Sequence, residues 1–260
     1  MKTTSLKLIA ALLLLGVGNE ALAAAVTFSG SKINPATNTQ LAASVTFNAI
    51  GSTLTVTLTN TSSQTMAAPT DVLTAVFFDI SGNPLLTPIK GQASGFVNGG
   101  AADSNGEVGG EWAYKANLSN APATRGVSSS GLGGTFGSSD VFPGLRLVDD
   151  GGQPPDGLGY GIASASYISG QGNGGIKNTP FFQNSVVLTL STVPNLDLTK
   201  ISNVSFQYGT ALNEVRYCAD QSPGCGGGPP AGVPEPASLA LLSAGLLGLA
   251  FRQRGRTRRV

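Results

Sequence analysis

Two adjacent segments of the chain, 41–48 and 52–59, alternate apolar and polar residues with a period of two. The apolar members are Ala43, Val45, Phe47, Leu54, Val56 and Leu58, and threonine occupies the alternate positions of the second segment. Because successive side chains of a strand point to opposite faces, each segment predicts a strand with one buried and one solvent-facing side. Gly51 lies in the short connection, so the two strands are expected to form a β-hairpin.

The rest of the chain favours the same class of structure. Short apolar or alternating runs predict further strands at 72–80, 111–118, 159–169, 185–191 and 204–208. The sequence contains 36 Gly and 15 Pro, and outside its two ends no segment has the 3.6-residue periodicity of a helix. These features predict an all-β fold, an antiparallel β-sandwich over residues 26–222, with a jelly roll as one form that it can take.

Residues 1–25 have the three parts of a secretory signal peptide. Lys2 and Lys7 supply positive charge, residues 8–17 form an uncharged apolar run, and Ala23 and Ala25 each end a small-x-small cleavage pattern. An apolar run of this length is too short to span the roughly 30 Å of hydrocarbon in a bilayer comfortably. We therefore expect export through the Sec translocon and cleavage by signal peptidase, the alternative being an uncleaved anchor.

The C-terminal end combines a second apolar segment with a cluster of positive charge. Residues 237–251 carry no charge, and the arginines that follow them are Arg252, Arg254, Arg256, Arg258 and Arg259. A helix of this length rises only about 22 Å, but arginines at its end can reach the headgroups, so a short transmembrane helix is expected. Arginine-rich ends stay in the cytoplasm, which places the preceding chain outside the membrane.

The order of elements at this end resembles a known sorting signal. Val233, Pro234, Glu235 and Pro236 precede the apolar segment, and a Gly/Pro-rich spacer over 223–232 precedes them. Residues 233–260 are thus similar to the PEP-CTERM sorting signal of Gram-negative envelope proteins. The resemblance implies processing near Pro-Glu-Pro by an exosortase, a membrane-embedded cysteine peptidase. The alternative is a C-terminal anchor that is never processed.

Three segments of the body, 147–150, 159–162 and 204–210, are similar to one group of exosortase-dependent surface proteins. The resemblance implies a precursor anchored in the inner membrane, whose mature form reaches the cell envelope, the outer surface or the extracellular medium. It also implies a link with exopolysaccharide or biofilm, and it carries no biochemical activity with it.

The composition excludes several functional classes. The sequence has no histidine, which removes the base of a Ser-His-Asp triad and the usual ligand of a catalytic zinc, and no cofactor is expected. Between residues 26 and 233, eight Lys and Arg stand against twelve Asp and Glu, a net charge of −4, so nucleic-acid binding is not expected. Cys218 and Cys225 enclose a short loop and, in an exported protein, predict a disulfide rather than two free thiols.

Gly170, Gly172 and Gly175 have the spacing of a dinucleotide-binding fingerprint. That fingerprint needs a helix to begin directly after it, because the helix N-terminus holds the phosphates. Pro180 follows within five residues, and the intervening residues open no helix. The segment is therefore interpreted as a glycine-rich turn between strands.

Asp149, Asp150 and Asp156 form an acidic cluster in a loop that also contains Pro and Gly. Three interpretations remain open at this point. The carboxylates can be a solvated turn whose side chains cap local amides, oxygen ligands of Ca²⁺, or the paired acids of a glycoside hydrolase.

Trp112 and Tyr114 fall on the same face of one predicted strand. Such rings can stack on sugars, but in a β-rich protein they also commonly belong to the core. Phe77, Phe78, Phe181 and Phe182 are expected in the core. The sequence as a whole predicts a non-enzymatic surface or matrix protein; the alternatives are a carbohydrate-binding module or adhesin with an exposed aromatic face, and a hydrolase acting through the acidic cluster.

Overall fold

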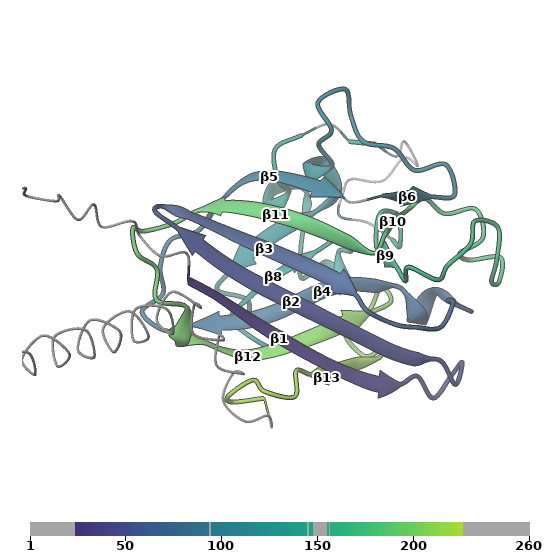
Figure 1. Cartoon of the computed structure of the whole chain (residues 1–260), viewed down its shortest axis with the longest axis horizontal. Helices are drawn as coiled ribbons and strands as arrows, with labels where there is room; N and C mark the ends of the chain where they lie inside the picture. The colour runs from purple at the N-terminus through teal and green to yellow at the C-terminus, as the bar shows by residue number, and fades with distance from the viewer. Residues whose placement is uncertain (1–23, 94, 145, 148–154, 156, 226–260) are drawn as a thin grey trace, which may run out of the picture.

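The computed structural model describes residues 24–93, 95–144, 146–147, 155 and 157–225 (Figure 1). Within these residues there are only strands and short 3₁₀ helices, with no α-helix. The strands are β1 (Ala24–Ile33), β2 (Gln40–Ile50), β3 (Thr53–Asn60), β4 (Leu73–Ile80), β5 (Thr87–Ala93), β6 (Phe96–Val97), β7 (Ala113–Ala116), β8 (Arg125–Ser128), β9 (Ile162–Ala163), β10 (Phe181–Gln183), β11 (Ser185–Ser191), β12 (Ile201–Tyr208) and β13 (Arg216–Cys218). The 3₁₀ helices are η1 (Pro69–Asp71), η2 (Gly109–Glu111), η3 (Leu132–Gly134), η4 (Ser138–Asp140) and η5 (Leu198–Lys200). The all-β class is confirmed.

The first sheet has five strands in the order β1-β2-β3-β11-β5, and all its pairs are antiparallel. Buried and partly exposed residues alternate along β2 and β3, as their sequence pattern predicts. Gly51 makes the turn between them with a φ of 57°, a backbone conformation that glycine adopts without steric cost. The predicted hairpin is confirmed, with Ile50 opposite Thr53.

The second sheet follows the order β13-β12-β4-β9-β10-β6, and β8 adds to it by pairing with both β4 and β7. All residues of β4 but one are buried. One of its faces meets the large core, and the other is covered by a separate apolar cluster that includes Phe77 and Phe136. Burial on both faces explains why the sequence of β4 is a continuous apolar run rather than an alternating one.

The largest hydrophobic core draws residues from both sheets. The ring of Phe47 on β2 contacts that of Phe78 on β4, with centroids 4.9 Å apart, and also that of Phe28 on β1 at 6.1 Å. The four phenylalanines expected in the core, Phe77, Phe78, Phe181 and Phe182, are all fully buried. Removing this apolar surface from water is the main force that holds the two sheets together.

Three expectations about the strands are wrong in detail. The segment 159–169 contains only the two-residue strand β9, because the chain turns back after Ala163 and the Tyr167 N–H donates to the Ser164 carbonyl. The segment 111–118 becomes extended only at Ala113, since η2 precedes it. The sheets are also not purely antiparallel: β9 and β10 pair in parallel, with Phe182 opposite Ile162.

Both ends of the described chain lie at the same end of the molecule. Ala24 begins β1 opposite Ala49, next to the Gly51 turn. The connection from β11 to β12 returns to this turn, where the Asn195 N–H donates to the Gly51 carbonyl (3.2 Å). Near the start of β12, the Asn203 N–H donates to the carbonyl of Pro223 (2.6 Å), which lies two residues before Cys225.

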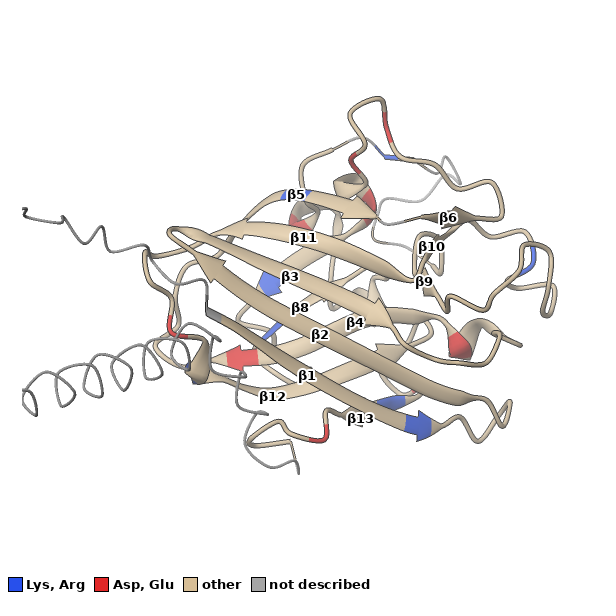
Figure 2. Ribbon diagram, in the orientation of Figure 1, with Lys and Arg blue, Asp and Glu red and all other residues tan. Residues whose placement is uncertain are grey.

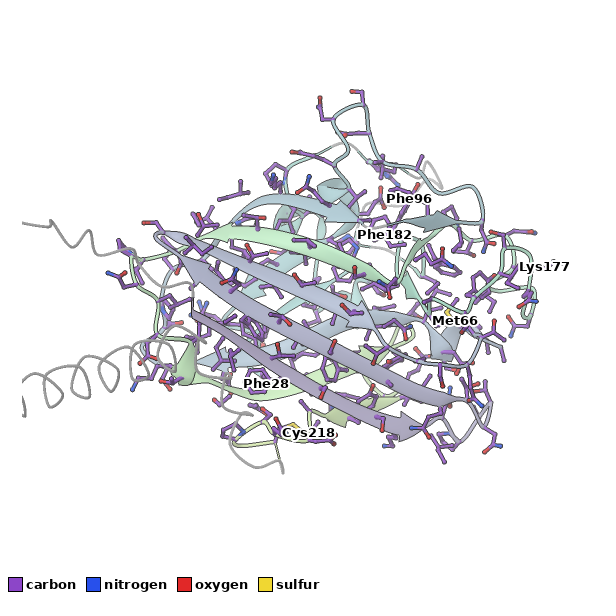
Figure 3. The ribbon with its side chains drawn as sticks, in the orientation of Figure 1. Phe28, Met66, Phe96, Lys177, Phe182 and Cys218 are labelled. Carbon is purple, nitrogen blue, oxygen red and sulfur yellow. A yellow bond between two sulfur atoms is a disulfide. The ribbon has the colours of Figure 1, made fainter. Side chains whose placement is uncertain are left out.

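We call this region the Gly51 end; it lies at the left of Figure 1. The opposite end carries the loops around Met66 and Lys177, labelled at the right of Figure 3, and is called the Met66 end. The Asn173 N–H donates to the Ala67 carbonyl (3.0 Å), so these two loops are in contact.

Candidate functional site

The last described segment of the chain is attached to the edges of both sheets. β13 pairs with β12, and after it the Ala219 N–H donates to the Val204 carbonyl (2.9 Å). The Asp220 N–H donates to the Ser29 carbonyl of β1 (2.8 Å). The segment that leads to the sorting signal is thus hydrogen-bonded to the first strand of the chain.

Cys218 and Cys225 are joined by a disulfide in the structure, with their Cα atoms 5.5 Å apart. The bond closes the loop that leaves β13. Ser222, inside the loop, is fully buried, and its Oγ accepts a hydrogen bond from the Val204 N–H. The loop is therefore held by the disulfide and by packing against β12.

Gly30 allows β1 to approach this segment closely. A Cβ atom at this position would lie 3.1 Å from the Cys218 carbonyl oxygen and 3.3 Å from the Tyr217 ring. Tyr217 in turn contacts Tyr208, with their hydroxyl oxygens 3.2 Å apart. Burial raises the pKa of both hydroxyls above the ordinary value.

Most of the predicted processing residues lie outside the described residues. These are Ala23, the sorting residues Val233, Pro234, Glu235 and Pro236, and the arginines Arg252, Arg254, Arg256, Arg258 and Arg259. Ala25 is described: it lies in β1 opposite Asn48. Cleavage after Ala23 leaves β1 complete, whereas cleavage after Ala25 removes its first two residues.

The predicted transmembrane helix 237–251 also lies outside the described residues. In the part of the chain that the structure describes, no helix has the length and apolar character needed to cross a membrane.

The acidic cluster of Asp149, Asp150 and Asp156 is likewise not among the described residues. Over the described ranges, no three Asp, Glu, Cys or His side chains gather as a metal-binding group.

The aromatic pair is buried, so it does not form the exposed aromatic face that the carbohydrate-binding alternative requires. Trp112 is fully buried, Tyr114 is 7% exposed, and the Trp112 Nε1–H donates to the Tyr160 carbonyl (3.1 Å). Tyr160 and Tyr167 are buried too. A sugar ring cannot stack on side chains that are already covered by protein, so the carbohydrate-binding alternative loses the residues on which it was based.

The glycine-rich segment forms a turn at the Met66 end. The chain passes from this turn into β10 rather than into a helix, so no helix N-terminus is available to a phosphate. Asn98 organises the segment: its side-chain nitrogen donates to the carbonyls of Ile176 and Thr179 (both 2.8 Å), and its side-chain oxygen accepts from the Gly170 N–H (3.0 Å). The interpretation as a turn between strands is confirmed.

The sequence reasoning missed Asp71, a buried carboxylate that joins two loops of the Met66 end. Its Oδ1 accepts hydrogen bonds from Asn34 Nδ2 and Thr37 Oγ1 (both 2.7 Å). Its Oδ2 accepts from Thr39 Oγ1 (3.2 Å) and from the N–H groups of the two residues before η1, Ala67 (2.9 Å) and Ala68 (3.3 Å). Each oxygen is saturated by neutral donors, so the arrangement is structural.

A second missed cluster lies at the Gly51 end. Asp79, at the end of β4, accepts hydrogen bonds from the Thr124 N–H (2.7 Å), the Thr124 hydroxyl (2.6 Å) and Asn203 Nδ2 (3.1 Å). Burial alone would raise the pKa of this carboxyl, but the hydrogen bonds, with the charge of Arg125, outweigh it and lower the pKa. Arg125 is itself buried and donates to the Tyr114 hydroxyl (2.6 Å).

The C-terminal sequence matches a known family model. The match covers residues 232–255 and is to the PEP-CTERM protein-sorting motif. The chain carries a PEP-CTERM sorting motif. It begins seven positions after Cys225, the last residue that the structure describes. Neither the comparison with curated proteins nor that with solved structures found a match.

The PEP-CTERM motif implies that the chain is exported as a membrane-anchored precursor and that an exosortase processes it for the cell surface. The predicted resemblance to PEP-CTERM proteins is confirmed. Every described residue of the chain lies upstream of this motif.

Proposed function

We propose that this chain is a non-enzymatic protein of the cell envelope or extracellular matrix. A signal peptide over residues 1–25 directs it through the Sec translocon, signal peptidase removes that segment, and a short transmembrane helix over 237–251 anchors the precursor in the inner membrane. Exosortase then cuts near Pro234-Glu235-Pro236, and the two-sheet body is released to the outer surface or medium. The sorting motif at 232–255 is the observation that carries the proposal.

The described residues support delivery of a finished, rigid body. The two sheets meet through Phe47 and Phe78, and we infer that they form a β-sandwich. The Cys218–Cys225 disulfide fits an oxidising compartment outside the cytoplasm. We expect a body stabilised in this way to stay folded after it has been released from its membrane segments.

Lack of catalysis is part of the proposal. The absence of histidine from the sequence supports it, because the common hydrolytic triads and zinc sites need that residue. The outer surfaces of β2, β3 and β11 support a role in contact with neutral polymer: these strands contain no Lys, Arg, Asp or Glu, as the uncoloured ribbons of Figure 2 show. We infer that the released body is retained by extracellular polysaccharide.

Fractionation combined with intact-mass measurement tests the proposal. In cells that contain exosortase, we expect a mature form that begins at Ala24 or Val26 and ends near Pro234-Glu235-Pro236. In cells without exosortase, the chain should stay in the membrane fraction with its C-terminus intact. A mass that includes the C-terminal arginines in both strains contradicts processing.

A pair of variants makes the test specific. Replacing Pro234, Glu235 and Pro236 by Ala should leave the uncut chain in the membrane. Replacing Pro229 and Pro230 by Ala, in the adjacent spacer, is the matched control and should leave processing unchanged. Loss of extracellular polysaccharide should shift the mature form from the cell surface to the medium; no shift contradicts retention by that polymer.

A further inference from the structure

Three exposed apolar side chains project from the Gly51 end. Ile50 is 53% exposed, Leu85 is 78% exposed and Val193 is 46% exposed. Each lies in or beside a tight connection, where a polar residue would meet water at lower cost. Grouped apolar side chains on a surface commonly mark a contact with another protein or a membrane.

The pairing of the strands places the three residues at the same end of the first sheet. Ile50 directly precedes the Gly51 turn. Val193 follows Thr192, whose N–H donates to the Ser52 carbonyl in that turn (2.9 Å).

Leu85 belongs to the next connection at the same end. It lies two residues before Thr87, which pairs with Ser191, and Val193 lies two residues after Ser191. Leu85 and Val193 therefore lie just beyond the last paired residues of the adjacent strands β5 and β11, at the same end of the first sheet.

The same end carries the points where the chain leaves the two-sheet body. Ala24 opens β1 there, and Cys225 lies two residues beyond Pro223, the partner of Asn203. Residues 226–236 separate Cys225 from the apolar segment 237–251. Eleven residues span at most about 38 Å, which is no more than the length of a long strand such as β2.

A tether of this length keeps the Gly51 end near the bilayer but does not by itself decide whether the body stands upright or lies on its side. The apolar side chains favour the upright orientation, because their burial lowers the free energy only if they enter the interfacial layer. Lys200 and Asp197 are both exposed at η5 and offset each other in charge, so the apolar side chains alone favour this contact.

We propose that, in the membrane-anchored precursor, the Gly51 end faces the bilayer and Ile50, Leu85 and Val193 contact its interfacial layer. The Met66 end, with its glycine-rich turn, then points away from the membrane. This inference rests on the proposed function, since it requires the C-terminal segment to be held in the membrane. After exosortase cleavage the contact is left without its tether, and the body detaches.

Quenching by brominated lipid tests this orientation. The full chain is isolated from the membranes of cells without exosortase and reconstituted into vesicles of phosphatidylethanolamine, phosphatidylglycerol and a brominated phosphatidylcholine. Tryptophan is introduced at the Gly51 end as Val193→Trp or, in the matched control, at the Met66 end as Ile168→Trp; Ile168 is 63% exposed. The single native tryptophan, Trp112, is buried in the core and provides the background signal.

We expect the fluorescence of the tryptophan introduced by Val193→Trp to fall by at least roughly twofold in the brominated vesicles. The reason is that an apolar surface in the interfacial layer is buried about 5–10 Å deep, within reach of the brominated lipid. The fluorescence of the Ile168→Trp chain should be quenched no more than that of the unmodified chain. In the Val193→Trp background, adding Ile50→Ser and Leu85→Ser should reduce the quenching, whereas adding Ile33→Ser and Ile168→Ser should not.

The vesicles are also sedimented, which separates two kinds of failure. If the chain sediments with the vesicles but both tryptophans are quenched equally, or Val193→Trp is not quenched, the orientation is wrong while the anchor stands. If the chain does not sediment with the vesicles, membrane anchoring itself fails, and the orientation fails with it.

Discussion

The five-stranded and the eight-stranded sheet differ in how their strands find partners. In the first sheet, β1, β2 and β3 are consecutive in the sequence and pair in order along nearly their full lengths. In the second, β4 pairs with β12, β8 and β9, which come from distant parts of the chain. Local pairing costs little loop-closure entropy, whereas distant pairing must be supported by additional contacts.

Those additional contacts are hydrogen bonds of polar groups, of which Arg125 and Gln207 are buried and Asp79 is partly exposed. Asp79, Arg125 and Gln207 lie on strands of the second sheet and hydrogen-bond to loops that the sheet must position. The exposed face of the first sheet carries mainly hydroxyl groups, such as those of Thr27 and Thr46, which are 2.8 Å apart. Apolar patterning thus suffices for a local meander, whereas a sheet assembled over long distances also needs specific hydrogen bonds.

The largest expected effect is at the core that both sheets share. Phe47→Ala should lower the free energy of unfolding by about 3–5 kcal/mol, because the ring contacts Phe28 and Phe78 and a cavity would remain. Thr57→Ala, on the outer face of β3, should change it by less than about 0.5 kcal/mol. Urea unfolding followed by Trp112 fluorescence measures both, and equal losses would contradict the division into an inner and an outer face.

The next largest effect is at Asp71. Asp71→Ala should lower the free energy of unfolding by about 2–4 kcal/mol, because buried donors, including Asn34 Nδ2, lose their acceptor. Asp103→Ala is the control: that carboxylate caps a local turn by accepting from the Asn105 and Glu107 N–H groups, and its loss should cost about 1 kcal/mol. Urea unfolding measures both, and a smaller loss at Asp71 would show that its loops do not depend on it.

The disulfide should have an effect of intermediate size. Replacing Cys218 and Cys225 together by Ser should lower the free energy of unfolding by about 2 kcal/mol, as expected for a short closed loop. Hydrogen exchange should rise more at Asp220, whose N–H bonds to β1, than at Asn60 in β3. An equal rise at both sites would mean that the loop supports the whole body rather than its edge.

The smallest effect concerns pH. Because the pKa of Asp79 in the folded state is lowered from 3.8, its contribution to stability is present above that value and is lost as the pH falls through the lower folded pKa. Asp79→Asn should therefore flatten the decline of stability below pH 3.8. Urea titrations at several acidic pH values measure this, and parallel curves for the two proteins would contradict it.

Part of the structure was predictable because the signal is local. The hairpin of β2 and β3 follows from alternation and one glycine, and the buried strand β4 follows from a continuous apolar run. The strands β8, β9 and β10 are too short to carry a pattern, and their pairing depends on where distant loops return. Asp71 was not found, because nothing in the sequence around it marks the donors on Asn34 and Thr37.

By itself, the sequence determined the class of fold, the two charged and apolar termini and the sorting motif, since each depends on residues that are close together in the chain. Only the tertiary structure decided that Trp112 is covered, that Asp71 joins two loops, and that Ala24 and Cys225 leave from the same end. These outcomes depend on contacts between segments far apart in sequence, and their free energies exist only once the two sheets have packed.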